Sequence, residues 1–373
     1  MGWRRSAVTL STLLLLAAPV DAQQQERLPV SLPVLVPLTG FVALEGTSQK
    51  NGALLAAGEL PNMLKAEVLD TTSTPEAAVT AWERSLGGGT PPAVIGPILG
   101  TQMLALLPLA QERKVPLLTI SGTTRLGESG NPYFFRFFPS DATVKVAHAR
   151  YVVEKLQRRQ VAIIYQSTAY GQSGREQLVK SFKELGAQIV LEESVSPTAN
   201  DLAYALLRAR SAGATVLVFH LHAASTVLAV RQAYKLLPDL PIVAGSAMHQ
   251  PATAALLEPA ELKNVCAETA SSPVSADTPE MRGFLEAYRA AYKSDPDAYA
   301  AAQYDAVKML GGILRELGAK ATPETVRAHL AGDTYRGIAG TYRSDGRGNM
   351  APEAEIVCYG GASRVPKVVA RYR

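Results

Sequence analysis

The stretch AVIGPILGTQMLALLPLAQERKVPLLTISGTTR, residues 93–125, decides the fold of this chain. Two apolar runs, 93–95 and 115–120, are typical of buried parallel strands, and the segment from about 101 to 113 between them has a helical pattern. Each run is followed by glycines and small hydroxyl residues. Neighbouring parallel strands end at one sheet edge, so these groups would meet beside a helix N-terminus. The stretch therefore predicts a receptor for a small anion such as a carboxylate.

The hydroxyl residues at this edge also have a purely structural interpretation. Side chains such as those of Thr101, Thr123 and Thr124 can cap a helix or end a strand in any α/β protein. We favour a ligand role because α/β sheets bind ligands at the carboxyl ends of their strands. The stretch contains no nucleophile–base pair, which favours binding over catalysis.

The first 22 residues predict a secretory signal peptide. Arg4 and Arg5 precede an apolar run at 8–16, and the small residues at 20–22 predict cleavage before Gln23. The run is shorter than the ~20 residues of a membrane span, and no cysteine lies near the cleavage site to carry a lipid anchor. We therefore expect a mature chain that is soluble outside the cytoplasm.

Composition narrows the possible classes of protein further. At 373 residues the chain is long enough for about two domains. The net charge is a modest +4, and the basic residues are scattered, which argues against nucleic acid as a partner. The two cysteines, Cys266 and Cys358, predict either one disulfide in an oxidising compartment or two buried free thiols. Their spacing does not decide between these.

Strand and helix patterns alternate through most of the chain, which predicts an α/β fold with doubly wound parallel sheets. The alternation breaks at 131–139, which is aromatic and bounded by prolines, and a new series begins after Ser140 and Asp141. Strand patterns return after a helical stretch at about 278–330, so the chain must recross between two lobes. The expected lobes are 28–139 plus 273–340 and 140–272 plus 341–373.

An ordered series of motifs resembles the periplasmic binding proteins of the leucine/isoleucine/valine type over nearly the whole mature chain. The motifs are VPLTG at 36–40, NGALLA at 51–56, VIGP at 94–97, YFFR at 133–136, and VAIIY at 161–165 followed by Tyr170-Gly171. The resemblance implies the type I fold, with two Rossmann-like lobes, a three-crossing hinge and a cleft that closes on a solute. It also implies a periplasmic monomer, without cofactor or enzymatic activity, that serves an inner-membrane ABC permease.

The resemblance also implies a ligand site. The loops after the third and fourth strands would hold a carboxylate, and the second lobe would contribute an aromatic residue and two strand-end residues. The implied ligand contacts are Gly100, Thr101, Ser121, Thr123, Thr124, Tyr170, His222 and Ser246. Amino-acid binders of this family place an acid after the next strand, where residues 245–249 have none. A buried unpaired ammonium is costly, so this departure weighs against an α-amino acid. The resemblance as a whole implies a small carboxylate-bearing or amino-acid-like solute.

Three alternatives stay open at this point. A ligand sensor that signals to a membrane receptor has the same fold. A secreted hydrolase is disfavoured, because Gly171 and Ser173 begin a nucleophile-elbow pattern that fails at Arg175. His220, His222 and His249 could form a metal site. We favour a histidine that donates to a ligand anion, with affinity that changes near the usual imidazole pKa of ~6.5.

Overall fold

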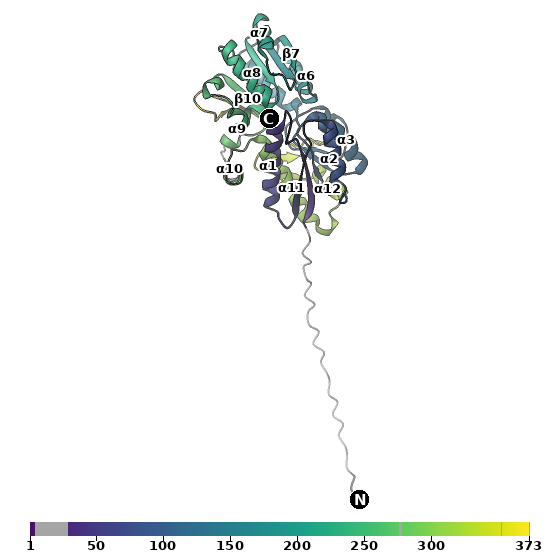
Figure 1. The fold of residues 1–373 in the computed structure, drawn as a ribbon. Helices are drawn as coiled ribbons and strands as arrows, with labels where there is room; N and C mark the ends of the chain where they lie inside the picture. Colours follow the sequence, from purple (N-terminus) through teal and green to yellow (C-terminus); the bar gives the residue numbers. More distant parts are fainter. Residues whose placement is uncertain (4–28, 276–277, 352, 373) are drawn as a thin grey trace.

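Two large β-sheets, one wholly parallel and one mostly parallel, form the centres of two lobes (Figure 1). The structure is a computed structural model that describes residues 1–3, 29–275, 278–351 and 353–372. Most of the predicted signal peptide, from residue 4, lies outside these ranges, as does its cleavage site. Among the helices of the described part, none combines the length and apolarity needed to cross a membrane.

The first lobe is built on a five-stranded sheet of order β2-β1-β3-β4-β5, with all strands parallel. Its strands are β1 (Val30–Val36), β2 (Leu64–Asp70), β3 (Val94–Ile95), β4 (Leu117–Thr119) and β5 (Phe134–Arg136). Its helices are α1 (Ala43–Gly58), α2 (Pro75–Ser85), α3 (Gly100–Arg113), α4 (Arg125–Glu128), α10 (Pro279–Tyr292), α11 (Ala298–Leu317) and α12 (Pro323–Gly332).

The strands of this sheet bury both faces, as their apolar sequences require. Leu32 and Val34 of β1 pack with α1 and α11 on one face, whereas Leu35 packs with α2 and α3 on the other. The α1–α11 contact is close: a Cβ at Gly52 would lie 2.1 Å from the carbonyl oxygen of Ala300. Figure 1 shows α1 and α11 side by side in this lobe.

The second lobe has a seven-stranded sheet of order β14-β13-β10-β9-β8-β6-β7. The parallel strands are β6 (Gln160–Gln166), β7 (Gln188–Val195), β8 (Val216–His220), β9 (Ile242–Ala244) and β10 (Val265–Thr269), and the antiparallel ones are β13 (Ala354–Cys358) and β14 (Lys367–Tyr372). Its helices are α5 (Asp141–Arg150), α6 (Ala169–Glu184), α7 (Ala203–Ser211), α8 (Ala223–Leu236) and α9 (Pro251–Ala254).

A disulfide joins the last parallel strand of this sheet, β10, to its antiparallel neighbour β13. Cys266 of β10 lies opposite Cys358 of β13 in the strand register, and their Sγ atoms are bonded. Of the two states that the sequence left open for these cysteines, the structure has the disulfide.

The chain crosses between the lobes three times: after β5, after β10, and between Met350 and β13. The third crossing lies later than the predicted boundary at 340/341. The hairpin of β11 (Thr334–Arg336) and β12 (Thr341–Arg343) precedes it. Asn349 then forms a bridge with Arg136 of β5 and also accepts from its guanidinium. This anchor keeps residues 341–349 on the first lobe, which corrects the predicted boundary.

Candidate functional site

A cavity of about 30 Å³ lies between the lobes, where strands of both sheets end. This is the edge at which α/β sheets bind ligands. Its walls come from the starts of α1, α5 and α6, the segments after β3, β4, β8 and β9, the first crossing, β10 and α11. The lining residues are Val42, Glu45, Ile98, Leu99, Ile120, Gly122, Phe138, Pro139, Asp141, Val144, Tyr170, His222, Ser246, Ala247, Glu268 and Tyr299.

Hydrogen bonds between the lobes surround this region. The Ala223 N–H donates to Glu45 Oε1 across 2.8 Å, and the Thr124 N–H donates to Ser173 Oγ across 2.8 Å. The Gln250 amide donates to Asp297 Oδ2 across 2.7 Å. The structure is therefore the closed arrangement of the two lobes, and a cavity this small admits about two water molecules. A larger solute must enter while the lobes are apart.

The loop after β4 presents hydroxyl groups that the fold does not use. Ser121, Thr123 and Thr124 each have a buried hydroxyl oxygen without a hydrogen-bond partner among the described residues. The buried Arg136 guanidinium instead donates to the carbonyl oxygens of Ser121, at 3.2 Å, and Thr123, at 2.7 Å. This anchor fixes the backbone of the loop and leaves its hydroxyls free for another partner.

The helix beside this loop offers further donors. α3 begins at Gly100, and the preceding residue, Leu99, supplies no side-chain cap. The first N–H groups of an uncapped helix favour an anion. Gly100 lets the two loops meet, because a Cβ there would lie 2.1 Å from Thr123 Oγ1. The loop and the helix thus place unpartnered hydroxyls and free N–H donors close together, and anion binding there stays a prediction.

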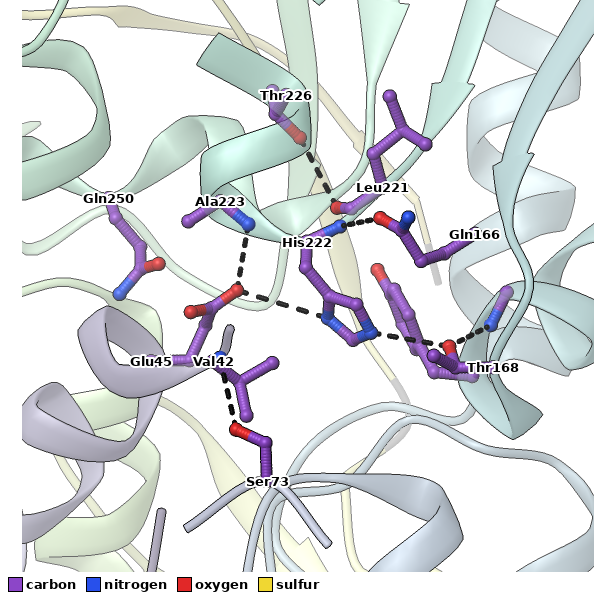
Figure 2. A network of polar contacts seen from close by, with 12 residues as sticks. Val42, Glu45, Ser73, Gln166, Thr168, Leu221, His222, Ala223, Thr226 and Gln250 are labelled. Atoms are coloured by element: carbon purple, nitrogen blue, oxygen red, sulfur yellow. Dashed lines mark hydrogen bonds and ion pairs between the residues drawn. The ribbon is translucent and has the colours of Figure 1, made fainter. Parts of the chain in front are cut away.

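Aromatic rings form the opposing wall. The ring of Tyr170 lies 3.9 Å from that of His220 and 5.1 Å from that of His222, measured between centroids. His222 Nε2 bonds Thr168 Oγ1 at 3.2 Å, and Figure 2 shows this bond together with the contact of His222 to Glu45. Burial lowers the pKa of His222 to about 3. In this closed arrangement His222 is therefore neutral at pH 7.

The predicted site residues divide into three groups. Tyr170, His222 and Ser246 line the cavity. Ser121 and Thr123 flank its lining residue Gly122, and Gly100 follows its lining residue Leu99. Thr101 is half-buried in the first turn of α3, and Thr124 borders a separate hinge crevice.

The histidines of the possible metal site bond separate partners. His220 Nε2 contacts the carbonyl oxygen of Tyr170 at 3.0 Å, His222 contacts Thr168, and His249 Nε2 contacts Ser272 Oγ at 2.9 Å. Each imidazole is thus held by its own polar neighbour. The structure favours individual structural roles for these rings over shared metal ligation.

The cavity wall also contains three buried acids that were not among the predicted site residues. They are Glu45, Asp141 and Glu268. Burial raises the pKa of Glu45 to about 7 and that of Asp141 to about 6. For Glu268, burial raises the pKa, but Lys145 and the His148 hydrogen bond outweigh it and hold the pKa below its usual value. The sequence did contain an indication of Glu268, because an acid near the end of an otherwise apolar strand is usually paired with a cation or a hydrogen-bond donor.

His249 predicts a loss of stability in acid. Burial lowers its pKa from 6.5 to about 4, so the unfolded chain binds a proton between these pH values that the folded chain does not. Neutral His249 makes its full contribution to the free energy of unfolding above pH 6.5, and that contribution is lost as the pH drops towards 4. Between pH 7 and pH 4 the free energy of unfolding, measured in urea, should therefore fall by roughly 3 kcal/mol less in His249→Gln than in the wild type. His329→Gln, on the partly exposed α12, is the control, and equal slopes for wild type and His249→Gln would contradict the prediction.

Two α/β lobes that share three crossings and close on a cavity define a hinged binding protein. A family model described as "Periplasmic binding protein" matches residues 29–355. The chain therefore belongs to the periplasmic binding protein family, and its relatives place it with the branched-chain amino-acid type, as the sequence motifs predicted. The Leu/Ile/Val-binding protein BraC3 of Rhizobium johnstonii is 23% identical over 87% of this chain and 89% of its own length.

Solved structures show the same fold. LivJ from Streptococcus pneumoniae, in complex with isoleucine, superposes with a TM-score of 0.82 at 22% identity, covering 91% of this chain and 99% of that one. A solute-binding protein of an ABC transporter from R. palustris, in complex with benzoate, has a TM-score of 0.84 at 16% identity, covering 92% and 96%. The fold is thus the type I periplasmic-binding-protein fold that the sequence predicted.

Proposed function

We propose that this chain is a periplasmic solute-binding protein that captures a small carboxylate-bearing or amino-acid-like solute and delivers it to an ABC importer. The observation that carries the proposal is the pair of buried, unpartnered hydroxyls at Ser121 and Thr123, which flank the cavity residue Gly122 near the uncapped start of α3. Buried polar groups are normally paired. A ligand carboxylate supplies the partner that these donors lack.

The structures with bound solutes support the same chemical class. Isoleucine and benzoate, bound by the two neighbours described above, share a carboxylate although they differ in everything else. In this chain the apolar lining residues, such as Ile98, Leu99 and Phe138, suit an aliphatic or aromatic body attached to that carboxylate. The disulfide fits an oxidising compartment such as the periplasm.

Capture would proceed by closure of the hinge. The bonds from Thr124 to Ser173 and from Ala223 to Glu45 join the lobes at the cavity and break when the lobes separate. A solute that contacts both walls shifts the equilibrium towards the closed form by its extra affinity for that form. The closed form is then the state that an importer would recognise.

The carboxylate assignment predicts a loss of affinity without a loss of stability. Thr123→Val and Ser121→Ala each remove a hydroxyl that bonds nothing among the described residues, so the folded chain loses no hydrogen bond. A hydrogen bond to a charged group contributes about 1.5–3 kcal/mol, so each variant should bind the solute roughly ten-fold or more weakly. Thr101→Val tests the expected hydroxyl in the first turn of α3. The measurement is calorimetric titration with the best carboxylate from a thermal-shift screen.

Thr119→Val is the matched control for these variants. Its hydroxyl lies on β4 just before the loop, donates to the carbonyl oxygen of Pro97 at 2.9 Å and accepts from the Ser121 N–H at 3.1 Å. This variant should lose about 1 kcal/mol or more of stability, whereas Thr123→Val should not. Unchanged affinity in both Thr123→Val and Ser121→Ala would refute the carboxylate site.

A further inference from the structure

A second hollow of the molecule lies beside the hinge, and its described lining residues are all different from those of the cavity. It is a crevice of about 350 Å³ between α4, the start of α5 and residues 343–351 at the third crossing. The first lobe supplies α4 and most of the crossing segment, whereas α5 belongs to the second lobe. The hinge crevice is therefore a separate site with walls from both lobes.

Arg136 places a buried positive charge in the wall of the hinge crevice. Its side chain is fully buried, and its guanidinium donates to the carbonyl oxygens of Ser121 and Thr123 and to Asn349 Oδ1. These acceptors are neutral. Among the described residues no carboxylate forms an ion pair with this guanidinium, and burial lowers the pKa of Arg136 to about 10. A buried charge without a counter-charge is costly, so this wall favours an anion.

Two further arginines line the hinge crevice. Arg343 and Arg347 are exposed, and neither side chain has an ion pair or a hydrogen bond within the described ranges. The oxygens of the neighbouring Asp345 are already occupied. They accept the Arg347 backbone N–H at 2.8 Å and the Asn349 side-chain amide at 2.6 Å. The two guanidinium groups are therefore free to bind a ligand from solution.

Hydroxyl groups add neutral donors to the same lining. Thr124 Oγ1 is buried and has no hydrogen-bond partner in the part of the chain that the structure describes. Ser140 caps α5 by accepting the Ala142 N–H at 3.2 Å, and this bond does not use its hydroxyl proton. Guanidinium groups and hydroxyls are the side-chain donors that suit a phosphate.

We infer that the hinge crevice binds a phosphate-like oxyanion, held by Arg343 and Arg347 beside the buried charge of Arg136. Such an anion brings several acceptor oxygens, which match the paired donors of a guanidinium group. It also balances the charge of a lining that has three arginines but only two acids, Glu128 and Asp345. Inorganic phosphate and the phosphate group of a small phosphomonoester share this chemistry. The site takes no part in holding the solute of the proposed function.

Calorimetric titration of the full mature chain tests the inference with two probes, sodium phosphate and glycerol 3-phosphate, at constant ionic strength and about pH 7.5. Wild type should bind at least one probe with a Kd of about 1 mM or tighter, and the tighter probe identifies the source of the anion. Arg343→Gln/Arg347→Gln should weaken that binding about ten-fold or more, because it removes charge-assisted hydrogen bonds.

A matched control shows whether the position of these charges matters. Arg210 and Arg282 are also exposed arginines, on α7 and α10, and neither lines the hinge crevice. Arg210→Gln/Arg282→Gln therefore changes the net charge equally and should keep the affinity for the probe within about two-fold of wild type.

Glu128→Gln should change the affinity in the opposite direction. Glu128 is exposed on α4 and is one of the two acids of the lining, so it repels an anion in the crevice. Its replacement should tighten binding of the probe about three-fold or more. A variant that binds more tightly is folded, so this result does not depend on the stability of the arginine variants.

Four outcomes would overturn the inference. The first is that neither probe binds at concentrations up to about 20 mM. The second is equal affinity in wild type and Arg343→Gln/Arg347→Gln. The third is chloride binding as tight as phosphate binding, which indicates general attraction of anions to a basic surface. The fourth is loss of phosphate binding in Thr123→Val but not in the arginine variant, which places the anion in the cavity between the lobes.

Discussion

Lys145→Met is expected to lower the free energy of unfolding by about 3–5 kcal/mol. Lys145 lies on α5 and pairs with Glu268 of β10, and both side chains are at most 1% exposed. Methionine fills a similar volume, but among the described residues it leaves the buried Glu268 carboxylate with the His148 hydrogen bond, at 2.9 Å, as its one remaining side-chain partner. Urea unfolding at pH 7, followed by circular dichroism, measures the loss.

Two further variants show whether the lost charge pair is the cause. Lys145→Met/Glu268→Gln removes both charges and should recover most of the stability, because a buried pair replaced as a whole is often nearly neutral. Lys308→Met breaks a partly exposed pair with Glu59, at 2.9 Å, and should cost less than about 1 kcal/mol. A double variant as unstable as Lys145→Met would instead point to packing around the methionine.

The ion pair also bears on the site. Asp141, Lys145 and His148 stand at positions i, i+4 and i+7 of α5, on one face of the helix, and all three are buried. Lys145 favours ionisation of both Asp141 and Glu268, which line the cavity. The positive charge of Lys145 therefore balances much of the negative charge of these two carboxylates. Glu45 is the acid of the cavity wall with the least positive charge around it.

The sequence predicted most of the fold because its strands are encoded locally. The runs at 93–95 and 115–120 contain β3 and β4, which are neighbours in the sheet, and the helix between them is α3. Apolar strands that alternate with helices leave few arrangements other than a doubly wound sheet. The hydroxyl loop was predictable for the same reason, because parallel strands place their carboxyl ends together.

The missed parts of the site depend on contacts between distant segments. The Glu45–Ala223 bond spans 178 residues and exists only when the lobes close, so no local pattern encodes it. The same is true of the third crossing, which Arg136 and Asn349 fix across 213 residues. The polar face of α5 was visible in the sequence, but an amphipathic helix with such residues normally turns them to solvent.

Removal of the disulfide is expected to lower the free energy of unfolding by about 4 kcal/mol. Cys266 and Cys358 are separated by 92 residues, so the bond restricts a long loop in the unfolded chain. That loop leaves the second lobe after β10, forms α10, α11 and α12 on the first lobe, and returns through β13. The bond therefore constrains two of the three crossings as well as the edge of the second sheet.

The measurement compares urea midpoints of the oxidised protein and of Cys266→Ala/Cys358→Ala. The wild type should shift to a lower midpoint in a phosphine reductant, and the double variant should not respond to the reductant at all. Because β10 and β13 remain hydrogen-bonded neighbours without the bond, the variant should still fold and keep the hinge. Its solute affinity should therefore stay within a few-fold of wild type, which separates a role in stability from a role in binding. Coincident midpoints for the two proteins, or two free thiols in protein purified from the periplasm, would contradict the prediction.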